Sequence, residues 1–393
     1  MSTSNRISTI DIFRALTMLM MLFVNDFAGM AGIPHFLGHA EATEDMLGFS
    51  DLVFPAFLFC VGLSIPFSIA NRRKKGDSDL KTVLHIVERS LFLIIMGIFS
   101  MNGRTVEGGI PRYVLSIAVV VSYFLIWNAY PKAEGAKKWI FRALQVLGAA
   151  ILIAIVIYKD VNGIHFKHSW WGILGLIGWA YGICALIYLF AGGSIRNTSI
   201  AWGAVTALCI LNSLPFIPED FTIRSVFLGF YPGGWTHPAL VMSGVFASTV
   251  LIQYAVNPVR QREYSIRMAL LGLPMYLLGC ICHKFWIISK IQATPTWLFF
   301  CLALFFPLLV LLYYVCDIKG KTKWATLVKP AGVATLTAYM LPSIWYAVMS
   351  ALQLHYPACL CSGGPGLLRS FVFAHVIILL TWCLGKLNIK LKL

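Results

Sequence analysis

Long apolar segments recur along the whole chain and are separated by short polar stretches. Each segment holds about 18 or more residues with few charges, which is enough for a helix to cross about 30 Å of hydrocarbon. Strands of a membrane barrel would instead show alternating segments of about 10 residues. The pattern therefore predicts an all-α, polytopic membrane helix bundle that forms a single domain over residues 1–393. We expect about twelve transmembrane helices, at residues 9–30, 51–70, 82–100, 113–130, 141–158, 171–191, 198–216, 238–256, 268–286, 296–316, 331–352 and 368–386.

The composition agrees with this pattern. Of the 393 residues, 59% are hydrophobic and 12% are charged, and the mean hydropathy is +0.79. A soluble domain would carry about 25% charged residues. The first apolar segment contains Asp11 and Arg14 and has no clear cleavage site, so we expect a retained helix and not a signal peptide.

The net charge of +15 first suggests nucleic acid, but the basic residues lie in loops that flank the apolar segments. We therefore expect no nucleic-acid partner. With the N-terminus inside, about 23 of the 31 Lys and Arg residues fall on the inner side, as the positive-inside rule requires. This bias predicts that both termini are cytoplasmic. Phosphate binding by a few inner residues is the alternative interpretation.

Cysteines and aromatic residues add little to the picture. The ten cysteines lie mostly inside the apolar segments. Cys359 and Cys361 fall in a predicted outer loop, where a disulfide is an open alternative. No His or Cys spacing indicates zinc, so no metal site is expected.

Aromatic residues beside the predicted outer stretches either anchor helices at the interface or stack on a sugar ring; they are Trp170, Trp171, Phe230, Tyr231 and Trp235.

The densest cluster of titratable groups lies between the first two apolar segments, in NDFAGMAGIPHFLGHAEATEDMLGFSDLVFP (residues 25–55). Polar groups beside a membrane are costly and need a partner or a function. Histidine is a natural general base near neutral pH, and this loop carries His35 and His39. Three acids are near enough in sequence to orient a histidine: Glu41, Glu44 and Asp45. The loop is therefore a candidate active site at the membrane face.

Three polar residues of the first apolar segment extend this cluster. Asp11 and Arg14 are three residues apart, so they lie on one helix face and are expected to pair. The alternative for Arg14 is to receive a phosphate or a carbonyl group. Asn25 lies close to three turns beyond Arg14 and projects to the same side. As a buried amide it needs a partner, which is either another helix or a developing oxyanion.

The sequence lacks two common catalytic signatures. It has no GxSxG elbow for a serine nucleophile. It also has no glycine-rich phosphate loop of the Walker or Rossmann type. A nucleotide-like cofactor would therefore bind through helix ends and basic side chains.

The first two segments carry a recognisable pattern, which returns near residues 295–297 and 317–320. Its residues are Arg6, Asp11, Phe13 to Leu16, Leu22 to Asn25, His39-Ala40, Asp51 to Pro55, Phe57, Phe59, Gly62, Ser64-Ile65, Pro295-Thr296-Trp297 and Asp317 to Gly320. The pattern resembles the catalytic membrane domain of heparan-α-glucosaminide N-acetyltransferases, in particular a bacterial branch long described as a domain of unknown function. The match is strong over residues 6–66 and looser elsewhere.

This resemblance implies a ten-helix transmembrane acyltransferase core. Such enzymes take acetyl-CoA from the cytoplasm and acetylate an amino sugar on the far side. The resemblance assigns the active-site histidine to His39 and the helix-end asparagine to Asn25. His35, Glu41 and Asp51 are then supporting candidates, and the choice between His35 and His39 as the base stays open.

In the mechanism that this resemblance implies, His39 deprotonates the amine and Asn25 stabilises the tetrahedral oxyanion. A covalent acetyl group on His39 is the alternative route. The phosphates of CoA would lie near Arg14, Lys74 and Lys75. Alternative functions are an O-acyltransferase of envelope glycans, an amino-sugar permease and a non-enzymatic scaffold.

The resemblance also sets the expected partners and location. The partners are acetyl-CoA, an amino sugar or glycan of the glucosamine or heparan sulfate type, and the lipid bilayer. A second copy of the chain in a homodimer is an open alternative. In a bacterium, the protein would lie in the inner membrane with the candidate loop in the periplasm.

Overall fold

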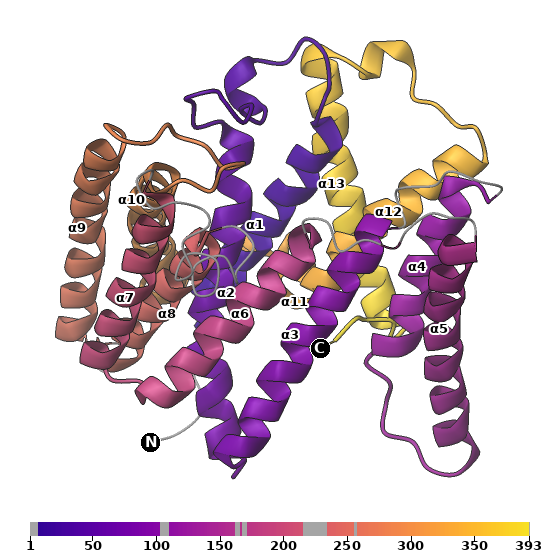
Figure 1. Ribbon diagram of the computed structural model, residues 1–393, viewed down its shortest axis with the longest axis horizontal. Helices are drawn as coiled ribbons and strands as arrows, with labels where there is room; N and C mark the ends of the chain where they lie inside the picture. The colour runs from indigo at the N-terminus through magenta and orange to yellow at the C-terminus, as the bar shows by residue number, and fades with distance from the viewer. Residues whose placement is uncertain are drawn as a thin grey trace. The chain divides into compact units, whose positions relative to one another are not determined.

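The computed structural model describes residues 7–102, 110–161, 166, 171–214, 234–254 and 258–392 (Figure 1). These residues form thirteen α-helices. The helices are α1 (Ser8–Phe27), α2 (Phe49–Lys74), α3 (Asp79–Asn102), α4 (Arg112–Trp127), α5 (Ala136–Val161), α6 (Gly172–Ala191), α7 (Ile195–Ser213), α8 (Thr236–Tyr254), α9 (Pro258–Cys282), α10 (Pro295–Tyr313), α11 (Lys329–Val333), α12 (Thr335–Ala351) and α13 (Gly363–Lys386).

The structure confirms an all-α, multi-pass membrane protein. Each of the twelve predicted ranges overlaps one of the helices longer than α11. Seven of the spans among the described residues are long and apolar enough to cross a membrane, and they are α2, α3, α5, α6, α9, α13 and α10 with its continuation to Ile318. The larger number of about twelve spans stays a prediction.

Helix α9 shows where the apolar pattern misplaces a boundary. The pattern predicts a span that begins at residue 268, with a basic loop before it, but the helix begins at Pro258. Proline suits the start of a helix because its missing N–H is not needed there. Glu263 and Arg267 form an ion pair one turn apart, which makes the basic stretch a favourable first part of the helix.

The chain divides into two compact units. The first unit contains Met1–Thr17, Pro34–Leu91 and Leu176–Ala325. In it α2 packs along α8, and α9 packs along α10 (Figure 1). The second unit contains Met18–Ile33, Phe92–Gly175 and Thr326–Leu393, and in it α4 packs against α5 and α12.

Helices α2 and α8 cross at two glycines in the core of the first unit. A Cβ atom on Gly62 would lie 1.9 Å from the carbonyl oxygen of Val241. A Cβ atom on Gly244 would lie 2.1 Å from the carbonyl oxygen of Phe59. Small residues allow membrane helices to approach this closely. The crossing therefore fixes α2 against α8, and the loop residues next to α2 depend on it.

The start of α1 is held by a carboxylate from a distant part of the chain. The backbone N–H groups of Ser8 and Thr9 each donate to an oxygen of Asp317, at 2.9 Å. Asp317 lies in the π-helical turn Tyr314–Ile318 that continues α10. The first N–H groups of a helix lack partners within the helix, and an anion stabilises them. This contact gives the segment from Asp317 to Gly320 a structural role.

The α2–α8 crossing predicts opposite effects for two glycine substitutions. Gly62→Ala should lower the free energy of unfolding by about 1–3 kcal/mol, because its methyl group cannot fit against the α8 backbone. Gly203→Ala is the matched control, since Gly203 lies in α7 and a Cβ atom added there would have no neighbour within 4 Å. Alanine there should leave stability unchanged or raise it. Thermal unfolding of the purified variants in detergent measures both; equal melting temperatures would contradict the close crossing.

Candidate active site

Asp51 lies in the first turn of α2 and is almost completely buried, with 1% of its surface exposed. A carboxylate is favourable at this end of a helix because the free N–H groups and the helix dipole are positive there. The loop between α1 and α2 folds back against the first turn of α2. A Cβ atom on Gly48, the residue before α2, would lie 2.3 Å from the carbonyl oxygen of Gly38. Glycine at residue 48 therefore lets the loop close over the start of α2.

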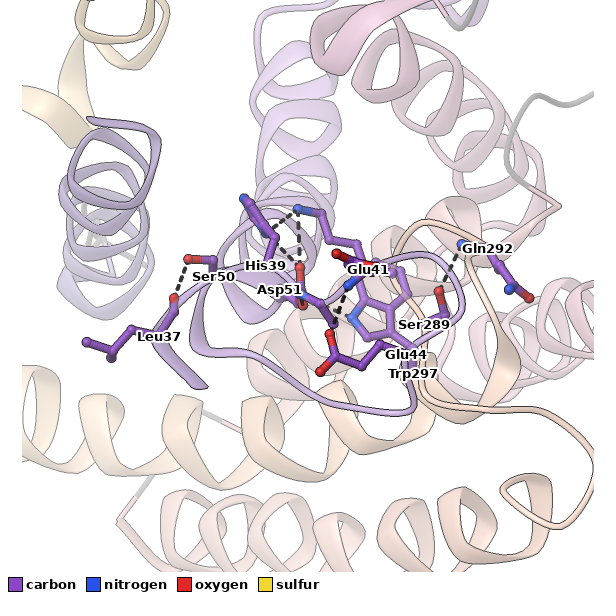
Figure 2. A network of polar contacts seen from close by, with 11 residues as sticks. Leu37, His39, Glu41, Glu44, Ser50, Asp51, Ser289, Gln292 and Trp297 are labelled. Atoms are coloured by element: carbon purple, nitrogen blue, oxygen red, sulfur yellow. Dashed lines mark hydrogen bonds and ion pairs between the residues drawn. The ribbon is translucent and has the colours of Figure 1, made fainter. Parts of the chain in front are cut away.

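Both carboxylate oxygens of Asp51 bond to that loop. Oδ1 lies 2.7 Å from Nδ1 of His39, and Oδ2 accepts a hydrogen bond of 3.0 Å from the N–H of Ala40 (Figure 2). An ionised carboxylate only accepts hydrogen bonds, so Nδ1 of His39 carries the proton. This tautomer leaves a lone pair on Nε2. The His39 side chain is 37% exposed, so Nε2 belongs to an accessible imidazole whose orientation a buried acid fixes.

Lys290 is a third member of this group and was not among the site residues predicted from the sequence. Its Nζ lies 3.6 Å from Oδ1 of Asp51 and 3.2 Å from Nδ1 of His39. Burial lowers the pKa of Lys290, and the neighbouring Asp51 carboxylate opposes this effect. One signal in the sequence was a lysine on the predicted outer side, against the positive-inside bias. That signal alone could not have identified its partner.

Trp297 supports Asp51 from the inside. Its indole Nε1–H donates to the backbone carbonyl of Asp51 at 3.2 Å, and the side chain is fully buried. Trp297 lies in the first turn of α10, where the hydroxyl of Thr294 caps the helix by accepting from the Trp297 N–H. The ring of His237 lies at right angles to the Trp297 ring, with centroids 6.4 Å apart. The Pro295-Thr296-Trp297 segment therefore has a defined role under the site.

A second loop, residues 283–294, forms hydrogen bonds with the loop between α1 and α2, which carries His39 (Figure 2). The carbonyl of Ala42 accepts from the Ser289 hydroxyl at 3.2 Å and from the Gln292 amide at 2.7 Å. Asp45 accepts from the N–H of Ile288 at 2.8 Å and contacts His283 at 2.7 Å. These contacts hold the segment that carries Lys290 next to the segment that carries His39.

The attachment between the two loops also affects the titration of Asp45. The hydrogen bond from the N–H of Ile288 lowers the pKa of Asp45, and His283 adds to the effect. Its contribution to stability is present above the ordinary pKa of an aspartate and is lost as the pH falls through the lowered value.

His35 and Glu44 form a separate pair. Nε2 of His35 lies 2.5 Å from Oε1 of Glu44. Among the described residues, neither of these two side chains forms a hydrogen bond with the side chain of His39. The Glu41 side chain is exposed; its backbone N–H donates to the Glu44 carboxylate at 3.1 Å, and its carbonyl accepts from the Glu44 N–H at 3.2 Å. This differs from the expectation that Glu41, Glu44 or Asp45 would orient the base, because Asp51 fills that position.

Asn25 lies near the end of α1, in the second unit, and its side chain is exposed and not buried as expected. The neighbouring Asp26 fixes this end of the helix. Its carboxylate is 2% exposed and accepts from Arg369 of α13 at 3.0 Å and from the Tyr346 hydroxyl of α12. The Arg369 guanidinium lies over the ring of Tyr356, 4.6 Å from its centroid. Asn25 therefore projects from a helix end that is well anchored within its unit.

The expected cofactor residues do not meet at one point. The predicted Asp11–Arg14 ion pair is confirmed, with a distance of 3.6 Å. Arg14 also donates to the hydroxyl of Ser64, which lies about 20 Å along α2 from Asp51. Lys74 and Lys75 lie at the far end of α2, about 15 Å beyond Ser64. They are exposed, and neither forms an ion pair within the described residues, whereas Arg72 and Arg73 pair with Asp77 and Asp79.

Two remaining expectations have simple outcomes. Cys359 and Cys361 are exposed free thiols, so the structure contains no disulfide between them. Trp170, Phe230 and Tyr231 lie outside the described residues.

The fold and this site define a multi-pass membrane protein that carries a carboxylate–histidine pair at one end of a spanning helix. The family profile described as Domain of unknown function (DUF5009) matches residues 6–236, and the chain belongs to this family. The matched range includes all of α1 and α2 and the loop that holds His39.

Two curated relatives are also similar to this chain. Heparan-alpha-glucosaminide N-acetyltransferase of Mus musculus is 25% identical over 357 residues, which cover 81% of this chain and 50% of the relative. The Homo sapiens protein of the same name is 33% identical over 97 residues, which cover 25% of this chain and 14% of the relative. The chain therefore spans at most about half the length of these relatives.

The His35–Glu44 pair predicts a pH-dependent contribution to stability. The hydrogen bond with Glu44 raises the pKa of His35 above its ordinary 6.5. The attraction is therefore fully present below pH 6.5 and is lost as the pH rises through the raised value. Melting temperatures of the parent and Glu44→Gln should differ most near pH 6 and converge at alkaline pH, by a small amount because the pair is exposed. Glu41→Gln is the control; parallel curves for the parent and Glu44→Gln would contradict the pair.

The Asp26–Arg369 pair predicts strong coupling between two substitutions. Arg369→Met leaves the buried Asp26 carboxylate without its cation, which should cost about 3–5 kcal/mol of unfolding free energy. Asp26→Asn combined with Arg369→Met removes that unpaired charge and should recover part of the loss. Melting temperatures of the parent, both single variants and the double variant measure the coupling. Additive effects would show that the pair does not anchor α1.

Proposed function

We propose that this protein is a transmembrane acetyltransferase that moves acetyl from cytoplasmic acetyl-CoA to the amine of a glucosamine-type sugar on the other side of the membrane. The observation that carries the proposal is the contact between the buried Asp51 carboxylate and Nδ1 of His39. Acyl transfer to an amine requires a base, and this contact leaves Nε2 of His39 able to accept a proton. The distant similarity to two N-acetyltransferases supports the same reaction.

In this mechanism His39 removes a proton from the amine as nitrogen attacks the thioester carbonyl. Asp51 fixes the imidazole and stabilises the imidazolium that forms, as the acid does in other acid–histidine pairs. Asn25 donates its amide N–H to the oxygen that becomes negative in the tetrahedral intermediate. The intermediate then collapses, the C–S bond breaks, and the leaving CoA thiolate takes the proton from the His39 imidazolium, which gives free CoA and restores the neutral base. The route through an acetylated His39 gives the same products.

The layout of α2 fits a reaction that uses a donor from one side and an acceptor from the other. Asp51 and Lys74 lie about 35 Å apart along the helix, which is close to the thickness of the bilayer. The positive-inside rule assigns the Lys74 end to the cytoplasm and the His39 loop to the opposite face. We propose that Lys74 and Lys75 attract the phosphates of CoA at the cytoplasmic mouth.

Arg14 would act between the two ends of α2, between the level of Asp51 and that of Lys74. It reaches Ser64, about 20 Å from Asp51 along α2, and an extended phosphopantetheine arm can cover that distance. Arg14 is therefore the better candidate for the pyrophosphate or an arm carbonyl, and the lysines for the outer phosphate. In a bacterial host, the protein would lie in the inner membrane with His39 facing the periplasm.

The first prediction of this proposal concerns turnover. Purified protein in detergent, given radiolabelled acetyl-CoA and a glucosamine-terminated oligosaccharide, should produce labelled N-acetyl sugar. His39→Ala should lower kcat by about 10²–10⁴-fold, because the base is lost. Asn25→Ala should lower kcat by about 10²–10³-fold, because one oxyanion donor is lost. Thermal unfolding confirms that each variant is folded.

The matched control is His35→Ala, which removes the other histidine of the same loop. It should retain most of the activity, because His35 pairs with Glu44 and not with Asp51. Loss of activity in His35→Ala with full activity in His39→Ala would exchange the two roles. Label transferred only to hydroxyl acceptors would make the protein an O-acyltransferase. Sugar uptake into vesicles without acetyl-CoA would make it a permease.

A further inference from the structure

We propose that Lys290 is a positioning residue for the acetyl transfer described above: its ammonium group balances the buried charge of Asp51, so that His39 does not have to supply the positive charge that this carboxylate requires. This inference rests on the proposed function only for its kinetic readout. The charge relation between Lys290, Asp51 and His39 also has a readout that needs no activity.

The geometry gives Asp51 two neighbours that can balance its negative charge. His39 Nδ1 is 2.7 Å from Oδ1 of Asp51, and Lys290 Nζ is 3.6 Å from the same oxygen. The Asp51 side chain is 2% exposed, so its negative charge is poorly screened by water. Without a lysine, the buried carboxylate would be balanced best by a protonated imidazole. With Lys290 present, protonation of His39 places a second positive charge 3.2 Å from the first.

The charge of Lys290 matters more than its contact with His39. Nδ1 can either donate to Asp51 or accept from Lys290, but not both at once. Donation to Asp51 has the shorter distance, 2.7 Å against 3.2 Å, and it leaves Nε2 unprotonated. Lys290 therefore acts through Asp51, whose ionised form it stabilises. An ionised Asp51 is the partner that holds His39 in the tautomer needed for catalysis.

The loop around Lys290 fixes this arrangement. The N–H of Ala293 donates to the carbonyl of Lys290 at 3.1 Å, which closes a turn before α10. Ser289 and Gln292 on either side both bond to the carbonyl of Ala42. The lysine therefore extends from a turn that is attached at both sides to the His39 loop.

The other titratable groups that face these three side chains do not supply the same charge. They are Glu44 of the first loop, His237 of α8 and Cys301 of α10. In the described part of the chain, Lys290 is the one lysine or arginine with its charged group within 4.0 Å of Asp51. Removal of the Lys290 charge should therefore directly change how strongly Asp51 favours the protonated form of His39.

The kinetic test compares the pH dependence of kcat/KM for the parent, Lys290→Met and Lys290→Arg. We expect the acidic limb of Lys290→Met to move to higher pH by about 1 unit or more, with little change at the alkaline plateau. Lys290→Arg keeps the charge and should follow the parent. Titration of the acceptor amine is common to all three proteins and cancels in the comparison. A uniform loss of activity at every pH, with no movement of the limb, would overturn the proposal.

The second test does not depend on turnover. In protein labelled with ¹³C at the histidine rings, the His39 signal is assigned by its absence in His39→Gln. The pH midpoint of that signal should rise by about 1 unit or more in Lys290→Met. Lys284→Met is the matched control, because Lys284 is exposed in the same loop and forms no ion pair within the described residues. An unchanged His39 midpoint in Lys290→Met overturns the inference, whether or not the protein transfers acetyl groups.

Discussion

The buried carboxylate of Asp51 is the constraint on which the rest of the site depends. A buried charge is tolerated only when its lone pairs are satisfied and a counter-charge is near. His39 and the N–H of Ala40 occupy the two oxygens, and Lys290 supplies positive charge. The path of two loops follows from this requirement, because each must bring its polar groups to the first turn of α2. The same requirement fixes the imidazole in an orientation suited to a base.

The position of Asp51 depends in turn on how α2 is packed. Gly62 and Gly244 bring α2 and α8 into backbone contact, and Trp297 holds the Asp51 carbonyl from the start of α10. Phe59 of α2 packs edge-on against Phe306 of α10, with ring centroids 5.6 Å apart. These contacts let a small number of rigid helices position a loop site, which is how a rigid scaffold usually presents catalytic groups.

Features that depend on local spacing could be predicted from the sequence, whereas features that depend on distant contacts could not. The helices follow from apolar segment length, and the Asp11–Arg14 pair follows from a separation of one helical turn. The resemblance to a known family pointed to His39 and Asn25 directly. Proximity along the chain correctly predicted an acid for His35, which is Glu44, but the acid that orients His39 is Asp51, a supporting candidate that lies twelve residues away, beyond three closer acids. Lys290 is 251 residues from His39, and no periodic pattern links them.

The measurement that tests the central claim most directly is acetyl transfer across a sealed membrane. Proteoliposomes would hold a glucosamine-terminated oligosaccharide inside, with radiolabelled acetyl-CoA added outside and matched vesicles containing His39→Ala. The account predicts that the enclosed sugar becomes labelled while acetyl-CoA stays outside, and that the His39→Ala vesicles remain unlabelled. Labelling only when both substrates share one compartment would contradict transfer through the bundle, and equal labelling with His39→Ala would contradict the site at Asp51.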